Sequence, residues 1–595
     1  MRAEAMSFYF LANEAVVQIP FFQRGYVWSK PNWEELLINL LDDKKNHFLG
    51  SLILKQLQPM TGRPREVLVI DGQQRLTTLS ILTRVIFDLF TEDVQANCEG
   101  AMQACLFYKR LVTDNELNVK IRHSRVDSNS YVRVIKGQAL SDINTIDDKC
   151  NGILKCYKYF HEELSKHNPE VKIGLFNRLL NNENKILVLV DLTEKEDEQA
   201  IFDTINSTGV RLSGADIIKN ALFQRALELP QDHSNNEDQT NAEVINLYTD
   251  CWDNVFSKDE ETITFWSTPR QTGRLMRDNI EILLHSILVI NGIFDPEKHT
   301  LSNLSSLYKE HIKGLNKNDL FAFASLIKEY ATIYREKIAS FERSSLFTYS
   351  DSRSRLLHIL EVCEISTFHP YLLFLLKEYG SNEDKLNEKL LELEKLVIRR
   401  LISKAETKNY NKMCKDLIKN DCLAKTMLNE ILDEQILTGL TNINNKYAAL
   451  ILFWVELKRR NTDNMQSVKE LKYNYSLEHI MPQKWEEHWS SVPYVDEAGE
   501  PLDDPDAAKN KRYSYVYHIG NMTLLNSSLN TSLRNYVFDH KMNGEGKKKG
   551  IKDYADLSIT RDDIVKPYED GDVVWNERKI FIRTASLHKE IVCIW

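Results

Sequence analysis

The pattern of apolar and polar residues predicts a mixture of strands and helices in the first part of the chain. Residues 48–55 and the β-branched run 66–70 are predicted to be strands, and residues 185–191 a buried strand. Apolar residues at helical spacing follow the second of these strands, over residues 76–90. This part of the chain should therefore contain both a sheet and helices.

The middle of the chain is predicted to be helical. Apolar residues recur at helical spacing beside charged faces in residues 279–290, 386–402 and 447–460. A polar, Asn-rich stretch at residues 231–239 indicates a loop near the start of this region. The pattern shows no separate catalytic motif here, so we interpret the region as a spacer and transmission element.

A chain of 595 residues is too long for one hydrophobic core. We predict a multidomain α+β fold with domains at residues 1–225, 226–460 and 461–595, the second of them mostly α-helical. Nine cysteines without a C-x-x-C pair argue against a disulfide framework and favour the cytoplasm. No apolar run approaches about 18 residues and the start lacks a signal-peptide pattern, so we expect no membrane partner.

A carboxylate–histidine pair near the C-terminus, closed by Ile-Met-Pro and followed by two asparagines, suits phosphodiester hydrolysis. His479 can take a proton from water, while Glu478 and Asn530 offer hard oxygen ligands to a divalent ion. Asn521 can hydrogen-bond the imidazole and fix its tautomer. The alternative is a strand end without catalytic role, in which the asparagines are turn and cap residues.

The spacing of these four residues resembles the HNH, or His-Me finger, nuclease signature. The resemblance implies a C-terminal ββα-metal domain in which His479 is the general base and Asn521 orients it. It also implies that Glu478 and Asn530 bind Mg²⁺ or Mn²⁺. A glutamate where aspartate is commoner and a long insertion between the two motifs are departures from that signature.

A second constellation follows the predicted strand 66–70. A tight turn and a helix start bring together five residues: Asp71, Gly72, Gln73, Gln74 and Arg75. Backbone N–H groups and an arginine around one point suit a phosphate. Gln23 and Arg24 lie in an upstream aromatic segment. In the alternative, Arg75 pairs with Asp71 or caps a neighbouring element.

These residues resemble the DGQQR motif of the ParB-like domain in GmrSD-type modification-dependent restriction enzymes. The resemblance implies that the motif binds and hydrolyses a nucleoside triphosphate (NTP), with Gln23 and Arg24 close by. Residues 200–220 agree with the same family. Asn206 in that segment either lines the nucleotide pocket or belongs to a purely structural helix–turn–helix.

The net charge of −10 is unfavourable for a nucleic-acid enzyme, but the local distribution matters more. Residues 509–552 carry nine Lys or Arg against two acids, and a basic rim suits a polyphosphate substrate. The predicted DNA-binding residues are Lys541, Lys547, Lys548 and Lys549. Residues 486–506 carry eight acids and no Lys or Arg, and we interpret them as a solvated loop or as one that discourages unproductive DNA entry.

Together these features predict an NTP-regulated, metal-dependent endonuclease of prokaryotic anti-phage defence that cuts modified double-stranded DNA. One HNH site cuts one strand, so a double-strand break would need two nicks or a homodimer. Tyr26 and Trp28 are either a sensing surface for the modification or core residues. One alternative is a nucleotide-switched DNA-binding regulator without cleavage. The other is an abortive-infection nuclease that acts on RNA or host DNA.

Overall fold

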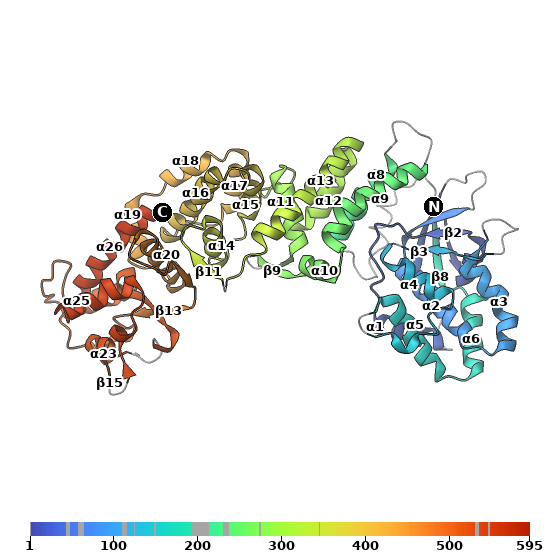
Figure 1. The fold of residues 1–595 in the computed structure, drawn as a ribbon, viewed down its shortest axis with the longest axis horizontal. Coiled ribbons are helices and arrows are strands. Elements are labelled where there is room, and N and C mark those ends of the chain that lie inside the picture. Colours follow the sequence, from blue (N-terminus) through green and yellow to red (C-terminus); the bar gives the residue numbers. More distant parts are fainter. Residues whose placement is uncertain are drawn as a thin grey trace. The chain divides into compact units, whose positions relative to one another are not determined.

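The computed structural model describes residues 2–42, 48–57, 65–109, 116–123, 125–147, 150–192, 213–229, 237–272, 275–343, 345–529, 535–545 and 548–595. They form two compact units, residues 1–248 and 249–595, each of which is described by itself (Figure 1). Both units combine helices with short sheets, so the predicted mixed α+β, multidomain fold is confirmed. None of the helices in the described ranges is long and apolar enough to cross a membrane.

The first unit is built on a six-stranded mixed sheet. Its strands, in spatial order, are β1 (Arg2–Met6), β8 (Leu187–Leu192), β3 (Ser51–Gln56), β4 (Glu66–Asp71), β2 (Val16–Gln18) and β7 (Ile121–Arg122). β3 pairs with β8 in parallel and with β4 in antiparallel orientation, while β4 pairs with β2 in parallel. The three strands expected from the sequence are confirmed, and β3 and β4 lie side by side.

Helix α2 (Gln73–Asp88) is the central helix of this unit and begins directly after β4. It contacts the helices α3 (Glu92–Leu106), α4 (Arg125–Ile135), α5 (Gly152–Ser165) and α6 (Pro169–Leu180). The turn between β4 and α2 requires glycine, because Gly72 has φ +90° and an added Cβ would lie 2.3 Å from the Leu52 side chain. Buried residues from α2 and the sheet form one core.

The remaining helices of the first unit are α1 (Lys30–Leu41), α8 (Gly214–Glu228), α9 (Glu237–Tyr248), η1 (Phe8–Asn13) and η2 (Ile143–Thr145). Two short strands, β5 (Phe107–Tyr108) and β6 (Asn118–Val119), pair with each other. Ser213 caps α8 by accepting a hydrogen bond from the backbone N–H of Asp216. The cap fixes the start of the helix that carries Asp216 and Lys219 (below).

The second unit begins with helices. They are η3 (Thr249–Ser257), α10 (Glu260–Ser267), α11 (Asn279–Ile290), η4 (Leu301–Asn303), α12 (Leu304–Gly314), α13 (Lys317–Ile333), η5 (Tyr334–Ile338), α14 (Ser352–Val362), α15 (His369–Glu378), α16 (Glu383–Ile402), α17 (Tyr410–Lys419), α18 (Leu423–Asn429), α19 (Asp433–Leu440) and α20 (Asn445–Thr462). Two antiparallel strand pairs accompany these helices. β9 (Pro269–Thr272) pairs with β10 (Leu275–Asp278), and β11 (Leu346–Thr348) pairs with the distant β12 (Glu470–Lys472). The three helices expected in this region are confirmed as α11, α16 and α20.

The C-terminal part of the second unit is built around the antiparallel pair β13 (Tyr475–His479) and β14 (Met522–Asn526). Its other elements are η6 (Trp485–Glu487), α21 (Pro505–Val516), η7 (Ile519–Asn521), α23 (Phe538–Asn543), β15 (Gly544–Glu545), β16 (Lys548–Lys549), η8 (Ile551–Asp553), α24 (Ser558–Thr560), η9 (Arg561–Val565), α25 (Lys566–Glu569) and α26 (Glu577–Ile594). A core with three tryptophans, Trp485, Trp489 and Trp575, supports the β13–β14 pair.

The acidic segment 486–506 is more than a solvated loop. Trp489 and Val495 are buried, and Val495 forms an isolated bridge with Pro501. The backbone carbonyls of Trp489 and Val492 accept hydrogen bonds from Arg512, which is itself fully buried. The segment is therefore anchored to the core, although most of its carboxylates face solvent.

Candidate functional sites

The β13–β14 pair positions the carboxylate–histidine motif. Glu478 lies opposite Thr523 and His479 opposite Met522 in the register of the two strands. Strand pairing thus brings the two C-terminal motifs together across about forty residues of intervening sequence, the separation of Met481 and Asn521. Glu478 and His479 are the last two residues of β13.

His479 has a free nitrogen. Its Nε2 is buried and has no hydrogen-bond partner among the described residues. Burial, together with a smaller effect of the nearby Lys541 charge, lowers the pKa of the imidazole to about 4. The ring also meets that of Tyr517 edge to face, with 6.4 Å between the centroids. The imidazole is therefore neutral at physiological pH and able to accept a proton.

Glu478 is paired with a buried lysine. Lys541 Nζ lies 2.5 Å from Glu478 Oε1 and 2.8 Å from the backbone oxygen of His479. Burial raises the pKa of Glu478 and lowers that of Lys541, and the mutual attraction of the two charges opposes both shifts. The prediction that Lys541 contacts DNA is corrected here, because its side chain is 0% exposed and bound to Glu478.

Asn521 makes four hydrogen bonds, none of them to the imidazole. Its Oδ1 accepts from the backbone N–H of Met481 (2.9 Å) and from Trp575 Nε1 (3.1 Å). Its Nδ2 donates to the backbone oxygens of Met481 (2.8 Å) and Val516 (3.0 Å). The expected contact with His479 is therefore wrong for this structure. Asn521 instead fixes the backbone two residues after the histidine.

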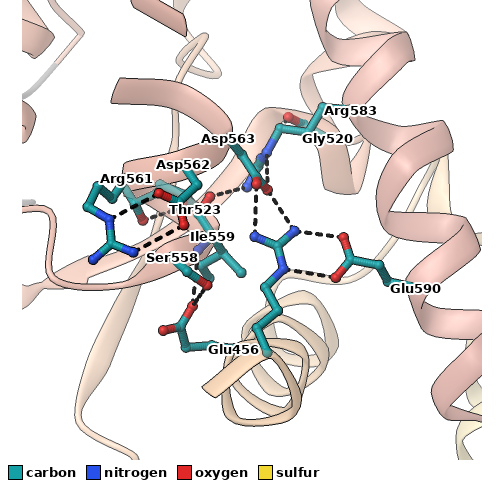
Figure 2. Close-up of polar contacts among 12 residues, drawn as sticks. Glu456, Gly520, Thr523, Ser558, Ile559, Arg561, Asp562, Asp563, Arg583 and Glu590 are labelled. Atoms are coloured by element: carbon teal, nitrogen blue, oxygen red, sulfur yellow. Dashed lines mark hydrogen bonds and ion pairs between the residues drawn. The ribbon is translucent and has the colours of Figure 1, made fainter. Parts of the chain in front are cut away.

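Arg583 on α26 holds the backbone on both sides of Asn521. It donates to the carbonyl oxygens of Gly520 (2.9 Å) and Met522 (2.6 Å), and its Nε lies 3.4 Å from Asp563 (Figure 2). Sequence reasoning missed this arginine, because one arginine on an amphipathic helix carries no signal of what it contacts. The link between α26 and the start of β14 is a product of tertiary packing.

The basic segment is less available to a polyanion than its composition suggests. Arg512 is bound to Glu577 at 2.6 Å with both side chains fully buried, and Lys511 pairs with Glu497 at 2.8 Å. Lys549 is exposed, and its ammonium lies 5.9 Å from the Tyr554 ring centroid. Lys547, Asn530 and the side chain of Lys548 lie outside the described residues, so the predictions for them stay predictions.

The glutamines at the β4–α2 turn join two motifs of the first unit. Gln74 Oε1 accepts from the backbone N–H of Val27 at 2.9 Å, and its Nε2 donates to Gly25 O at 3.0 Å. Gln73 Nε2 donates to Arg24 O at 2.8 Å. These contacts hold the aromatic segment 19–28 against the start of α2.

All three glutamines expected to contact nucleotide donate hydrogen bonds to backbone oxygens. Gln23 Nε2 donates to Val69 O at 2.9 Å, and both ends of the Gln74 amide are used as described above. Gln73 differs, because its Oε1 is buried and has no partner among the described residues. Gln73 therefore retains a buried acceptor that a ligand could use.

Charged residues from three elements gather near this turn. Arg75 Nη1 donates to the Ser51 backbone oxygen at 2.6 Å, so the arginine caps the start of β3. Burial lowers the pKa of Arg75 and raises that of Asp71, and each charge opposes the shift of the other. The alternative that Arg75 pairs with Asp71 or caps a neighbouring element thus holds in part. Its guanidinium bonds the backbone at the start of β3 and is attracted to Asp71.

Helix α8 brings further charges to the same cluster. Lys219 Nζ lies 2.9 Å from Asp216 Oδ1. Burial alone would raise the pKa of Asp216, but Lys219, Ser213 and Arg24 outweigh it and lower that pKa. Burial lowers the pKa of Arg24, and attraction to Asp216 and Asp71 opposes the shift. Arg24, Asp71 and Asp216 therefore lie within electrostatic reach of one another.

Tyr26 is part of the fold. Its hydroxyl is 2.6 Å from Thr78 Oγ1 and accepts from Trp33 Nε1 at 2.8 Å, while its ring packs against the core. Trp28 also packs against that core. These contacts favour the core alternative for both aromatic residues. Asn206 lies outside the described residues, and its role stays a prediction.

The fold and these two sites define a multidomain α+β protein with a charged cluster in its first unit and a carboxylate–histidine site in its second. Residues 9–223 match the N-terminal domain of the GmrSD restriction endonuclease, and residues 429–590 match the C-terminal domain of GmrSD restriction endonucleases. The chain therefore belongs to the GmrSD restriction endonuclease family.

A relative from Methanocaldococcus jannaschii, the uncharacterized protein MJ0686, is 24% identical over 246 residues. The aligned part covers 37% of this chain and 41% of that relative, so the chain spans less than half of the relative's length. The similarity adds a distant archaeal relative without adding an activity.

Proposed function

We propose that this protein is an NTP-regulated, divalent-metal-dependent DNA endonuclease of anti-phage defence, with an HNH-type C-terminal site and a ParB-like N-terminal domain. The observation that carries the proposal is the neutral imidazole of His479, whose buried Nε2 has no partner among the described residues, on the residue that follows Glu478 at the end of β13. A base and a carboxylate at one strand end are the groups that metal-assisted phosphodiester hydrolysis needs.

His479 acts as the general base in this proposal. Its lowered pKa keeps the imidazole neutral, so it takes a proton from the attacking water through Nε2. Asn521 and Lys541 act on the backbone around His479 and keep the imidazole directed toward the substrate.

The donor set fits a hard divalent ion in part. Glu478 supplies a carboxylate oxygen, and Asn530, outside the described residues, is proposed as a second ligand. Within the described residues, no group of three or more His, Cys, Asp or Glu could hold a metal. Bound Mg²⁺ or Mn²⁺ supplies positive charge for the pentacovalent phosphate and the leaving oxygen.

The charged cluster of the first unit is proposed to bind the nucleotide. Arg24, Arg75 and Lys219 offer positive charge, and Gln73 Oε1 and Asn220 Oδ1 are buried without a partner among the described residues. Cations attract phosphates, while unpartnered amide oxygens accept hydrogen bonds from a base or ribose. Hydrolysis of the NTP and control of cleavage by it belong to the same proposal.

The substrate is proposed to be modified double-stranded phage DNA, cut by two nicks or by a homodimer. The test is cleavage of modified and unmodified phage DNA by purified protein, with and without Mg²⁺ and each NTP. His479→Ala should lower the rate by about 10²–10⁴, as expected for loss of a general base. His488→Ala removes an exposed histidine of the same region and should cut at the wild-type rate. A His479→Ala protein that cuts normally would exclude the HNH assignment.

A further inference from the structure

Lys541 stands out among the lysines of the C-terminal region because its ammonium is completely buried. It lies on α23, more than sixty residues after the strand that it contacts. A buried ammonium is costly unless it is paired and hydrogen-bonded. Within the described residues, this ammonium donates to Glu478 Oε1 and His479 O, which belong to two consecutive residues of β13.

The two contacts of Lys541 act on different parts of the carboxylate–histidine motif. One of them fixes the side chain of Glu478 and the other fixes the peptide oxygen of His479. Asn521 holds the backbone N–H and oxygen of Met481, two residues after His479. The backbone is therefore held at His479 itself and two residues later, and the orientation of the imidazole depends on both sets of hydrogen bonds.

The contact with Glu478 also has an electrostatic consequence. The side chain of Glu478 is 11% exposed, so without a positive neighbour its carboxylate would be an uncompensated, largely buried charge. A divalent ion on the same carboxylate would be repelled by an ammonium 2.5 Å from one of its oxygens. The lysine and the ion thus compete for one negative charge.

We propose that Lys541 is a positioning residue of the nuclease site. It aligns His479 through the backbone and serves as the counter-charge of Glu478 before a divalent ion binds. The role toward the ion rests on the proposed nuclease function, whereas the role toward Glu478 does not. The two parts can therefore fail separately.

A double-substitution cycle tests the counter-charge. Lys541→Met should lower the Tm of the second unit by roughly 5–15 °C, because an unpaired carboxylate stays buried. Adding Glu478→Gln removes that carboxylate and should restore most of the loss. If Lys541→Met alone yields no folded protein, recovery of folding in the double variant is the expected result. A double variant no more stable than Lys541→Met would overturn the proposal.

Metal alone provides the second readout. Mn²⁺ should raise the Tm of Lys541→Met more than that of the wild type, since the ion replaces the missing charge. Lys389→Met is the matched control: Lys389 is also buried in the second unit, with Glu392 and Asp421 both at 3.2 Å. The Tm of Lys389→Met should be lower than that of the wild type, and Mn²⁺ should raise it no more than it raises the Tm of the wild type. An equal Mn²⁺ response in both variants would contradict the competition between lysine and ion.

Cleavage kinetics separate positioning from simple loss of structure. Lys541→Met should lower kcat about 10-fold or more through misalignment of His479, while the Mn²⁺ concentration for half-maximal rate decreases. A purely structural lysine would leave that concentration unchanged or raise it, and such a result would refute the positioning role. If the wild-type protein cuts no substrate, the proposed function fails, but the stability cycle still decides whether Lys541 is the counter-charge.

Discussion

The guanidinium of Arg459 bonds both carboxylate oxygens of Asp563, at 2.8 and 3.1 Å. Arg459 extends from α20, and its remaining hydrogen bonds go to Glu590 of α26 at 2.8 and 2.7 Å. Asp563 also pairs with Arg583, which in turn holds the carbonyls on either side of Asn521. A continuous set of polar contacts thus leads from a helix of the middle region to the backbone next to the candidate nuclease site (Figure 2).

Replacing the shared carboxylate should weaken this connection. Asp563→Asn removes the ion-pair partner of the buried Arg583 and leaves Arg459 with Glu590 alone, and should cost about 3–5 kcal/mol in the free energy of unfolding. Urea unfolding measures the loss, and the cleavage rate should fall with it as the backbone at Asn521 loosens.

The neighbouring carboxylate is a matched control for that substitution. Asp562 bonds only Arg561 in the described structure, at 3.0 and 3.1 Å, and both side chains are about half exposed. Asp562→Asn should cost no more than about 1 kcal/mol, as is usual for exposed pairs. Equal losses in the two variants would mean that the contacts of Asp563 with the two arginines contribute little.

The sequence predicted what depends on local pattern. Apolar spacing located α2, α11 and α16, because helices of this kind bury one continuous face and the period of 3.6 residues is visible along the chain. The strands β3 and β4 were located from short runs of apolar and β-branched residues. The spacing of the motifs also anticipated that the segments of His479 and Asn521 come together across β13 and β14.

Side-chain partners could not be predicted in this way. Lys541 was counted as a DNA contact because a sum of charges cannot tell a paired lysine from a solvated one. Asn521 was expected on the imidazole, yet its amide has four other partners from the backbone and Trp575. Nothing in the sequence pattern indicated that Arg583 bonds the backbone beside Asn521. Each of these contacts joins residues far apart in the chain and depends on packing.

Buried histidines should make the second unit unstable in acid. His358 on α14 is fully buried, and its Nδ1 accepts from Trp454 Nε1 at 3.1 Å. Burial, together with a smaller effect of the Arg343 charge, lowers its pKa to about 3, whereas an unfolded histidine has a pKa near 6.5. The unfolded chain therefore binds more protons, and the stability from this group is present above pH 6.5 and lost as pH falls toward 3.

The size of this effect can be measured with His358→Gln. Between pH 6.5 and 5 one such histidine should cost about 2 kcal/mol, because each pH unit is worth about 1.36 kcal/mol per proton. Urea unfolding at pH 7.5 and pH 5 should show a smaller decrease for the variant than for the wild type. The pKa of His285 is lowered to about 3 mainly by burial, so part of the decrease should persist. Identical decreases in both proteins would mean that His358 is not held neutral.

The basic segment is expected to contact phosphates through its lysine triplet. Replacing Lys547, Lys548 and Lys549 together with alanine should weaken DNA binding and lower the slope of log K against log salt by up to about 0.9 per lysine. The measurement is DNA affinity at several salt concentrations. Lys589→Ala, which removes an exposed lysine of α26, should leave the slope unchanged. An unaltered slope in the triple variant would place these lysines away from the DNA.

Arg75 tests whether the two ends of the chain communicate. If its guanidinium binds nucleotide phosphate, Arg75→Ala should weaken NTP binding about 10- to 100-fold, since a charge-assisted hydrogen bond contributes about 1.5–3 kcal/mol. Titration calorimetry measures the affinity, and cleavage with and without NTP measures the regulation. The variant should lose the response of cleavage to NTP, whether nucleotide activates or restrains the nuclease.

A second arginine of the same helix provides the control for this last experiment. Arg84 lies on α2 and pairs with Asp88 at 2.7 Å, away from the turn that carries the motif. Arg84→Ala removes a similar charge and ion pair but should leave NTP affinity and regulation intact. Because Arg75 also caps β3 through Ser51, the Tm of both variants must be compared before binding is interpreted. Normal NTP affinity together with an unaltered NTP response in Arg75→Ala would rule out the phosphate contact.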